Sequence, residues 1–497
     1  MDTMRKQPAG NIYIHYTRRF KKIYLCLIAV FCMGFISTDI CLGQQTSVPF
    51  LDLDEACLMA LQTHEQIMIA EREIVKSQLL PKKADSIVMP KASAYAAYRR
   101  LDNPIEWDVK LGEIMLPPIT TIPEEQVVGD VEITQPLYRA NWQPRRQQAT
   151  HIINRNTEAY YQVVQDILFT VTQAYYEVNK AKELVKNSQE LLQLAENEHV
   201  LATVKFEQGV VTEDAVLSSE LKMVSTQSKL IENTNYLQWS RNLLTQLIGG
   251  GIGDYDVMPP KVVSASTEEF RVLVDMAMDN RHDYKQSLAL IDIASSDVEA
   301  GKARFYPTVD ASLGYYMVDR TTYYEDYNHL MATIQLKIPL FEGGIRWWDL
   351  KEKRESLQQA KLTKLDLKKR IETEVDKAML SVQTYEGVLQ NSKKQVELAQ
   401  KNYAITFSKF KSGAATNVDL NQAFSILNTS KKELIVTTYD HQVAILRLRK
   451  VLGIFARDFI KLIDIEALEE QQAGTSTRKT IINIAPVVYS EANDIDG

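Results

Sequence analysis

Cysteine is scarce in this 497-residue chain, and most of it lies in one short segment. Three of the four cysteines, Cys26, Cys32 and Cys41, fall within the first 43 residues. Only Cys57 follows them, so the rest of the chain cannot form an intramolecular disulfide, even in an oxidising compartment. The stability of the fold must therefore come from packing.

Long apolar runs are also missing. Beyond the first 43 residues, no stretch approaches 18 consecutive apolar residues, which excludes a transmembrane helix from that part of the sequence. The apolar run at 23–36 follows a basic cluster at 18–22 and is shorter than the roughly 20 residues that span a bilayer. This pattern is typical of a signal peptide, with a signal anchor as the alternative. We expect no lipid at Cys41, because no small residue directly precedes it.

Motifs that carry chemistry are absent from the sequence. The histidines after residue 43 show no metal-ligand spacing such as H-x-x-x-H, and no G-x-S-x-G or P-loop pattern occurs. The glycine-rich segment 249–253 follows a predicted helix and lacks the lysine of a phosphate cradle, so we expect a linker there. The net charge is −7, and the first 43 residues carry +4, which leaves −11 for the rest and disfavours nucleic-acid binding. The sequence predicts no enzyme, no cofactor, no metal site and no nucleic-acid partner.

What the chain does contain is a copy of itself. Shifted by 204 positions, residues 171–249 align with residues 375–453 without a gap. A gapless register of this length indicates a duplicated structural unit of domain size. The identical pairs include Val171 with Val375, Ala174 with Ala378, Val178 with Val382, Gly209 with Gly413 and Gly249 with Gly453.

Long helices dominate both copies, and their only proline is Pro144, in a first turn where proline is tolerated. At about 1.5 Å per residue, the longest helix of each copy would reach roughly 100 Å. Small residues recur every seven positions, as at Ala174, Ala181 and Ser188, and this period indicates coiled-coil-like packing. The predicted helices are 52–80, 141–208, 213–248, 268–303, 345–411 and 417–452.

Four segments between the helices alternate apolar and polar residues. In one of them, Val309, Ala311 and Leu313 alternate with Asp310 and Ser312. Such alternation predicts strands with one apolar and one polar face, which suits either a membrane barrel or a small soluble sheet. Four strands cannot close a barrel alone, so the chain must oligomerise if it spans a membrane. The predicted strands are 92–98, 130–134, 309–317 and 332–338, joined in pairs by loops at 99–126 and 319–328.

Each long helix is followed by the same turn signal. Phe206 precedes Gly209 as Phe410 precedes Gly413, and a glycine just past a helix end takes the left-handed conformation that stops it. Each copy is therefore predicted to form a helical hairpin with its turn at the glycine. The two phenylalanines are expected to lock the hairpins.

The segments at the element boundaries resemble those of a known family. The segment Ile338-Pro339-Leu340-Phe341-Glu342-Gly343-Gly344-Ile345-Arg346, with its first-copy counterpart Gln135-Pro136-Leu137-Tyr138, resembles the TolC-like outer-membrane efflux proteins. Asn280-Arg281-His282-Asp283, the opening Leu51-Asp52-Leu53-Asp54-Glu55-Ala56 and the Phe-x-x-Gly turns fit as well. The resemblance extends over roughly residues 50–455.

This resemblance implies a fold, an assembly and a role. The fold is α+β, mostly α, in which long antiparallel helical hairpins form a trimeric α-barrel and four strands per chain contribute to a 12-stranded outer-membrane β-barrel. The role is that of a passive exit duct for efflux or secretion, coupled through a periplasmic adaptor (membrane fusion) protein to an inner-membrane RND or ABC transporter. The location is the outer membrane, in contact with its lipid, with a periplasmic extension.

The resemblance also implies roles for residues near the turns. In relatives, two aspartates three residues apart ring the periplasmic aperture; Asp419 matches the first, and Gln422 stands in place of the second. Ala415 and Ala215 replace the basic and acidic residues of the relatives' salt-bridge network at the turns. As the periplasmic ends of the hairpins, the turns are expected to dock the adaptor. The residues expected there are Phe206, Gly209, Phe410 and Gly413.

Two functions remain in competition at this point. Besides the outer-membrane duct, the chain could be a soluble periplasmic coiled-coil adaptor or scaffold, although no lipoyl-like or adaptor-barrel sequence separates the helices. The cargo stays open in either case. The expected division is a signal peptide at 1–43, a first repeat at 44–250, a linker at 251–267, a second repeat at 268–455 and a C-terminal tail at 456–497.

Overall fold

The computed structural model describes residues 50–108, 110–250, 255–264, 268–319 and 326–457. The expected signal peptide and all but the first two residues of the expected tail lie outside the described residues. Within them, one order of elements occurs twice: short helices, two strands of the main sheet, a long helix, a turn and a returning helix.

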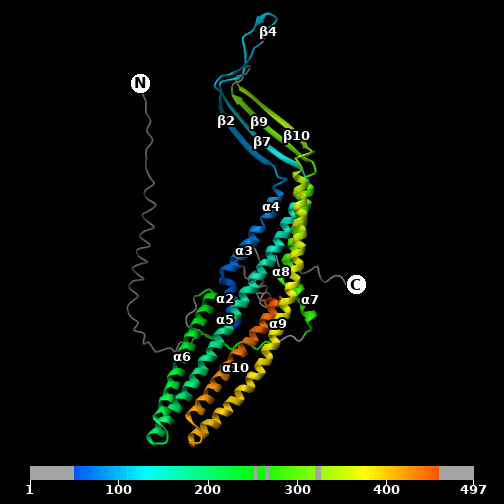
Figure 1. The fold of residues 1–497 in the computed structure, drawn as a ribbon. Coiled ribbons are helices and arrows are strands. Elements are labelled where there is room, and N and C mark those ends of the chain that lie inside the picture. Colours follow the sequence, from blue (N-terminus) through cyan, green and yellow to red (C-terminus); the bar gives the residue numbers. More distant parts are fainter. Residues whose placement is uncertain (1–49, 109, 251–254, 265–267, 320–325, 458–497) are drawn as a thin grey trace, which may run out of the picture. The chain divides into compact units, whose positions relative to one another are not determined.

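The four long helices lie where the sequence predicts them. Helix α5 (Trp142–Glu207) is followed by α6 (Glu213–Leu247), and α9 (Ile345–Lys411) is followed by α10 (Asn417–Val451). In each copy the second helix returns along the first, which makes two helical hairpins (Figure 1). Helix α10 also packs against α5, so the two hairpins contact one another.

The stripe of small residues forms the packed faces of these hairpins. Its members on α5 and α10 are at most 6 % exposed, because small side chains allow the helix backbones to approach closely. The prediction drawn from the seven-residue period is confirmed on both helices. The buried residues are Ala174, Ala181, Ser188, Ala195 and Ala202 on α5, and Ala423, Ser430, Thr437 and Ala444 on α10.

The prediction of a single helix before each strand pair is wrong, because each of these segments is broken. The segment expected as one helix at 52–80 is α2 (Leu53–Thr63), α3 (Glu65–Ser77) and the start of α4 (Leu80–Asp85). The segment expected at 268–303 is α7 (Phe270–Asn280) and α8 (His282–Ala303).

Contacts with distant segments accompany these breaks. His64 and Arg281 have extended backbones, with ψ of 122° and 126°. Next to the first break, the Thr63 hydroxyl donates to the Ile248 carbonyl at 3.0 Å. At the second, the Arg281 guanidinium donates to the Val451 carbonyl at 3.3 Å. These partners are distant in sequence, so a local periodicity pattern cannot contain them.

The four predicted strands form one antiparallel sheet in the order β10-β9-β7-β2 (Figure 1). Within one chain, β10 and β2 are the edges of this sheet, and each pairs with a single described strand. The strands are longer than the alternation predicts, because they continue into the flanking segments. Their bounds are β2 Lys91–Arg100, β7 Glu125–Arg139, β9 Thr308–Asp319 and β10 Asp326–Lys337.

The two faces of the sheet differ in chemistry. Val131, Tyr315 and Leu330 are cross-strand neighbours, and so are Ile133 and Leu313, so these side chains project from one face. All five are more than 40 % exposed. The opposite face carries polar cross-strand neighbours such as Thr134, Ser312 and Thr333. The sheet thus has an exposed apolar face and a polar face, as the alternation predicts.

The loop expected at 99–126 contains further strands, which the sequence analysis missed. Ile119-Thr120-Thr121-Ile122 is rich in β-branched residues and forms a strand, whereas the prolines that suggested a loop lie between strands. These short strands pair as two small hairpin ladders, β3 with β6 and β4 with β5. Their bounds are β3 Ile105–Trp107, β4 Lys110–Leu111, β5 Ile114–Met115 and β6 Ile119–Ile122.

The described part of the expected linker also holds a strand. There, β8 (Asp256–Val257) pairs in parallel with β1 (Phe50–Leu51) at the start of the first copy. The Tyr175 hydroxyl of α5 lies 3.0 Å from the Leu51 carbonyl and 2.7 Å from the Met258 carbonyl. The segment between the copies is therefore attached to the long helix of the first copy.

Three hydrophobic clusters make up the core. One surrounds the middle of α5, a second surrounds the middle of α9, and a third lies between the two hairpins near their turns. The first contains Cys57, and burial raises the pKa of its thiol to about 12. The first two clusters use residues that match under the 204-residue shift. The matched buried pairs are Val171 with Val375, Val178 with Val382, Leu244 with Leu448 and Ile248 with Leu452.

Among the helices that the structure describes, none combines the length and the apolar composition needed to cross a membrane.

Candidate functional site

Both hairpin turns close in the same way. Gly209 and Gly413 have φ of 71° and 78°, a conformation that glycine adopts without strain. After α5, the Val210 amide donates to the Lys205 carbonyl at 2.9 Å, and the Ala414 amide does the same to the Lys409 carbonyl after α9 at 2.8 Å. These bonds are those of a Schellman motif, so the glycine stop predicted for each helix is confirmed.

Asp419 lies in the first turn of α10, where it completes a helix cap. The Asp419 amide donates to the Thr416 hydroxyl at 3.2 Å, and the Asp419 carboxylate accepts from the Thr416 amide at 2.9 Å. This reciprocal pair is a capping box. Hydrogen bonds from the side chain and backbone of Thr416 hold the pKa of the Asp419 carboxyl below its usual value of 3.8. Gln422 is exposed one turn further along the same face of α10.

The two phenylalanines at the turns have different surroundings. Phe206 is 43 % exposed, whereas Phe410 is 3 % exposed and belongs to the cluster between the hairpins. The Lys205 ammonium lies over the Phe410 ring, 4.6 Å from its centroid, and also donates to the Phe410 carbonyl. Of the two phenylalanines among the four residues expected to dock an adaptor, only Phe206 presents its side chain at the surface of the single chain.

A buried polar network connects all four long helices above the turns. Glu198 of α5 is 2 % exposed and forms an ion pair with Lys222 of α6. The Tyr403 hydroxyl of α9 donates to Glu198 Oε1 at 2.5 Å, and the Lys222 ammonium lies 4.6 Å from the centroid of the Phe424 ring of α10. Burial lowers the pKa of the Lys222 ammonium, and this effect outweighs the attraction of Glu198.

The sequence contained a signal for this network that went unused. Glu198 lies three residues after Ala195 on α5, and Lys222 lies three residues after Ser219 on α6, so both charges fall on the buried faces of their helices. A charge on a buried face needs a partner. That pattern pointed to an ion pair between the helices.

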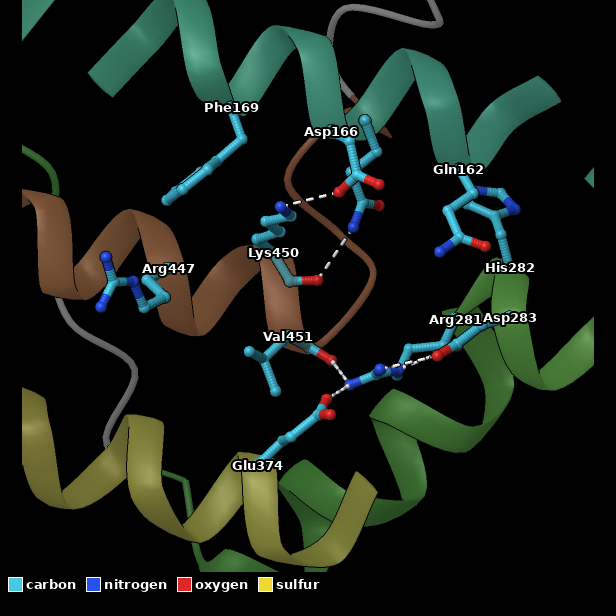
Figure 2. Close-up of a pocket in the computed structure, with 11 residues that line it drawn as sticks. Gln162, Asp166, Phe169, Arg281, His282, Asp283, Glu374, Arg447, Lys450 and Val451 are labelled. Carbon is cyan, nitrogen blue, oxygen red and sulfur yellow. Dashed lines mark hydrogen bonds and ion pairs between the residues drawn. The ribbon is translucent and has the colours of Figure 1, made fainter. Parts of the chain in front are cut away.

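A second polar cluster surrounds a cavity of about 290 Å³ where α5, α7, α8, α9 and α10 meet (Figure 2). The Arg281 guanidinium binds the Asp283 carboxylate at 2.7 Å, Glu374 of α9 at 2.6 Å and the Val451 carbonyl at the end of α10 (Figure 2). Burial disfavours the charged form of the Asp283 carboxyl. The hydrogen bonds from Arg281 outweigh this effect of burial and lower the Asp283 pKa.

Across the same cavity, Lys450 of α10 forms an ion pair with Asp166 of α5 at 2.7 Å (Figure 2). The Gln165 side chain, also from α5, donates to the Lys450 carbonyl at 3.0 Å. Since these charged groups come from α5, α8, α9, α10 and the break between α7 and α8, the cluster acts as a structural joint between the copies. In the part of the chain that the structure describes, no group of three or more His, Cys, Asp and Glu could hold a metal ion.

Comparison with known proteins is consistent with this architecture. The family model described as outer membrane efflux protein matches residues 59–250 and 273–454, which together are most of the chain. The chain belongs to the outer membrane efflux protein family.

Curated relatives of this efflux protein share modest sequence identity. It is 22 % identical over 361 residues to the alkaline protease secretion protein AprF of Pseudomonas aeruginosa, covering 68 % of this chain and 72 % of AprF. It is 21 % identical over 340 residues to the outer membrane protein TolC of Vibrio cholerae, covering 65 % of this chain and 76 % of TolC.

Solved structures show the same fold at lower identity. The structure of CusC matches with a TM-score of 0.68 and 15 % identity over 82 % of this chain and 93 % of that one. The outer membrane protein VceC of Vibrio cholerae matches with a TM-score of 0.66 and 17 % identity over 81 % and 96 %. The family places the efflux protein in the outer membrane, and these neighbours share its fold.

Proposed function

We propose that this protein is the passive exit duct of a tripartite efflux or secretion system. In this proposal three copies assemble, and their sheets close into one 12-stranded β-barrel in the outer membrane. Their hairpins form an α-barrel that extends into the periplasm. A periplasmic adaptor protein connects it to an inner-membrane transporter of the RND or ABC type, and the duct itself performs no enzymatic step. The two repeats, 44–250 and 268–455, supply equal shares of sheet and hairpin.

The observation that carries the proposal is the four-stranded sheet with one exposed apolar face. Leu330, Ile334 and Leu336 are each more than 55 % exposed on β10, which is unusual for apolar side chains in water. A bilayer would cover this face, and the polar face would then line an aqueous lumen. Open edges are not tolerated in lipid, so β10 of one copy would pair with β2 of the next.

The turns are the proposed contacts with the rest of the system. Phe206, Gly209 and Gly413 lie at the ends of the hairpins, and Phe206 offers an exposed aromatic side chain to an adaptor. In the assembled duct, Asp419 and Gln422 would surround the periplasmic aperture, since both lie exposed in the first turns of α10.

A soluble adaptor or scaffold accounts less well for these observations. It would use the hairpins, but it would leave the apolar face of the sheet in water at a cost of about 25 cal/mol for each Å² of apolar surface. The sheet therefore favours the membrane duct.

Fractionation and cross-linking of the full-length protein in a Gram-negative host test the proposal. The protein is expected in the outer-membrane fraction, to need detergent for extraction and to cross-link as a trimer. Purified trimers should form conducting pores in planar bilayers. A monomer recovered from the periplasm without detergent would contradict the proposal.

A further inference from the structure

A second cavity, of about 320 Å³, lies where the sheet meets the long helices. Its wall combines the end of β7, the start of β9, the end of β10 and the residues next to the starts of α5 and α9. Four of the lining residues are cations, and one is an acid. The cations are Arg139, Arg304, Lys337 and Arg346, and the acid is Glu342.

The charges around this cavity do not cancel. Arg346 is 7 % exposed and pairs with Glu342 at 3.1 Å. Arg139 pairs with Asp310, and Arg304 pairs with Asp349. Lys337 is exposed and forms no ion pair with any residue that the structure describes. The four cations are thus paired with only three carboxylates. The Lys337 ammonium remains without a partner among the described residues and can bind a further negative charge.

The wall of this cavity also contains a side-chain amide, that of Asn141. Asn141 is the N-cap residue of α5, and its side chain makes no capping hydrogen bond. The amide groups in the first turn of a helix lack partners within the helix, and the helix dipole places partial positive charge there. The Asn141 side chain, beside the unpaired Lys337 ammonium and near the positive end of the helix dipole, provides donors for an oxyanion.

The strand residues show which face of the sheet the cavity adjoins. Arg139 pairs with Thr308, and Lys337 pairs with Thr308 from the other side. Paired residues in neighbouring strands project to the same face. Asp310, two residues beyond Thr308, shares that face, which is the polar one.

We propose that this cavity binds a phosphate or carboxylate group of a solute that moves along the polar face of the sheet. The site recognises the oxyanion through the Lys337 ammonium and the Asn141 side-chain amide, while Arg346 supplies fixed positive charge behind them. The inference rests on the proposed function, because that function turns the polar face toward the lumen. Three copies would then place a basic belt at the junction of the barrel and the helical tube, within a duct whose chains are net acidic.

Calorimetric titration of the full-length protein in neutral detergent with inorganic pyrophosphate at low salt tests the site. Wild type should bind pyrophosphate, and Lys337→Gln should weaken binding by about tenfold or more, the size of one lost charge-assisted hydrogen bond. Asn141→Asp should abolish binding, because it places a carboxylate in the cavity while keeping a good N-cap residue. The matched control is Lys361→Gln, an exposed lysine of α9 outside the cavity, which should bind as wild type does.

Several results would overturn the assignment. The proposed anion site would be refuted if wild type did not bind pyrophosphate. It would also be refuted if Lys337→Gln and Asn141→Asp both bound pyrophosphate with wild-type affinity. Binding of short-chain phosphatidylglycerol that depends on Lys337, without binding of pyrophosphate, would assign the cavity to a lipid headgroup instead of a lumenal solute.

Planar-bilayer conductance of the same preparations separates this inference from the proposed function. Conducting pores without pyrophosphate binding would refute the site and leave the duct in place. If the protein bound pyrophosphate through Lys337 but formed no pore, the claim that the site faces the lumen of a duct would be overturned.

Discussion

Gly453 lies directly against the backbone of Arg281. A Cβ atom on Gly453 would stand 2.8 Å from the Arg281 nitrogen, closer than real Cβ contacts come. Gly453 also has φ of 74°, so a side chain there would be strained as well as crowded. The first copy has the same arrangement, since a Cβ atom on Gly249 would overlap the Thr63 side chain. Each returning helix therefore ends at a glycine packed against the break between two short helices.

Gly453→Ala should destabilise the protein. The left-handed conformation costs roughly 1–2 kcal/mol for a residue with a side chain, and overpacking adds about 1–3 kcal/mol because the contact atoms are backbone. Gly387→Ala is the control, since a Cβ atom added to Gly387, in α9, would meet no atom of a neighbouring element within 4 Å. That change should be neutral or stabilise by up to about 1 kcal/mol. Thermal unfolding in detergent measures both, and equal midpoints would contradict the packing argument.

Breaking the buried pair of Glu198 and Lys222 should loosen the hairpins. Glu198→Gln leaves the Lys222 ammonium buried without its partner, and such a loss costs roughly 3–5 kcal/mol. Burial already lowers the Lys222 pKa despite the attraction of Glu198, and apolar side chains of similar volume often replace a buried ion pair without loss of stability. The double variant Glu198→Leu with Lys222→Met should therefore recover most of the stability. Chemical denaturation of the three proteins measures this, and a double variant as unstable as the single one would contradict it.

Asp419→Asn should reduce the cation preference of the channel. Three copies of Asp419 near the axis would focus a negative potential in a narrow opening, where low-dielectric walls strengthen it. We expect the ratio of cation to anion permeability to fall roughly twofold or more, with weaker block by multivalent cations. Asp214→Asn, in the first turn of α6, is the matched control. Single-channel recordings measure this ratio. An unchanged cation preference in Asp419→Asn would mean that Asp419 acts only as a helix cap.

The cap at the start of α10 should weaken in acid. The pKa of Asp419 is depressed in the folded state, so its contribution is fully present above the unfolded value of 3.8. The contribution is lost as the pH falls through the lower folded value. Amide exchange near Thr416 should therefore rise below about pH 4 in wild type, relative to a distant helical segment. Asp419→Asn should not show this dependence, and an identical pH response in both proteins would exclude the carboxylate as its source.

Gly413→Val should impair transport without preventing assembly. Nothing lies within 4 Å of an added Cβ at Gly413, so the cost is the left-handed backbone alone, roughly 1–2 kcal/mol. The strain would distort the turn proposed to dock the adaptor, while the sheet and cores stay intact. Gly387→Val, within α9, is the control. The two measurements are the export of cargo and the yield of trimer in the outer membrane. Normal export by a variant substituted at both Gly413 and Gly209 would place adaptor docking elsewhere.

The sequence by itself determined the repeated plan of this protein. The 204-residue register, the seven-residue stripe and the alternation near Val309 are local or periodic signals, and each produced the element it predicts. The stop at Gly413 needed only the chemistry of one residue, because a left-handed turn is open to glycine and costly to others. Two points stay predictions: that the turns dock an adaptor, and that Asp419 lies at the periplasmic aperture.

Only the tertiary structure decided where the chain departs from its periodic pattern. The break at Arg281 depends on Glu374 and Val451, which lie far along the sequence on other helices. The sequence places Glu198 and Lys222 on buried helix faces, but only the packing of α5 against α6 shows that they pair with each other. The cavity near Lys337 arises where strand ends and helix starts from both copies converge. Such contacts are set by three-dimensional packing between distant segments, and no local pattern of residue types contains that information.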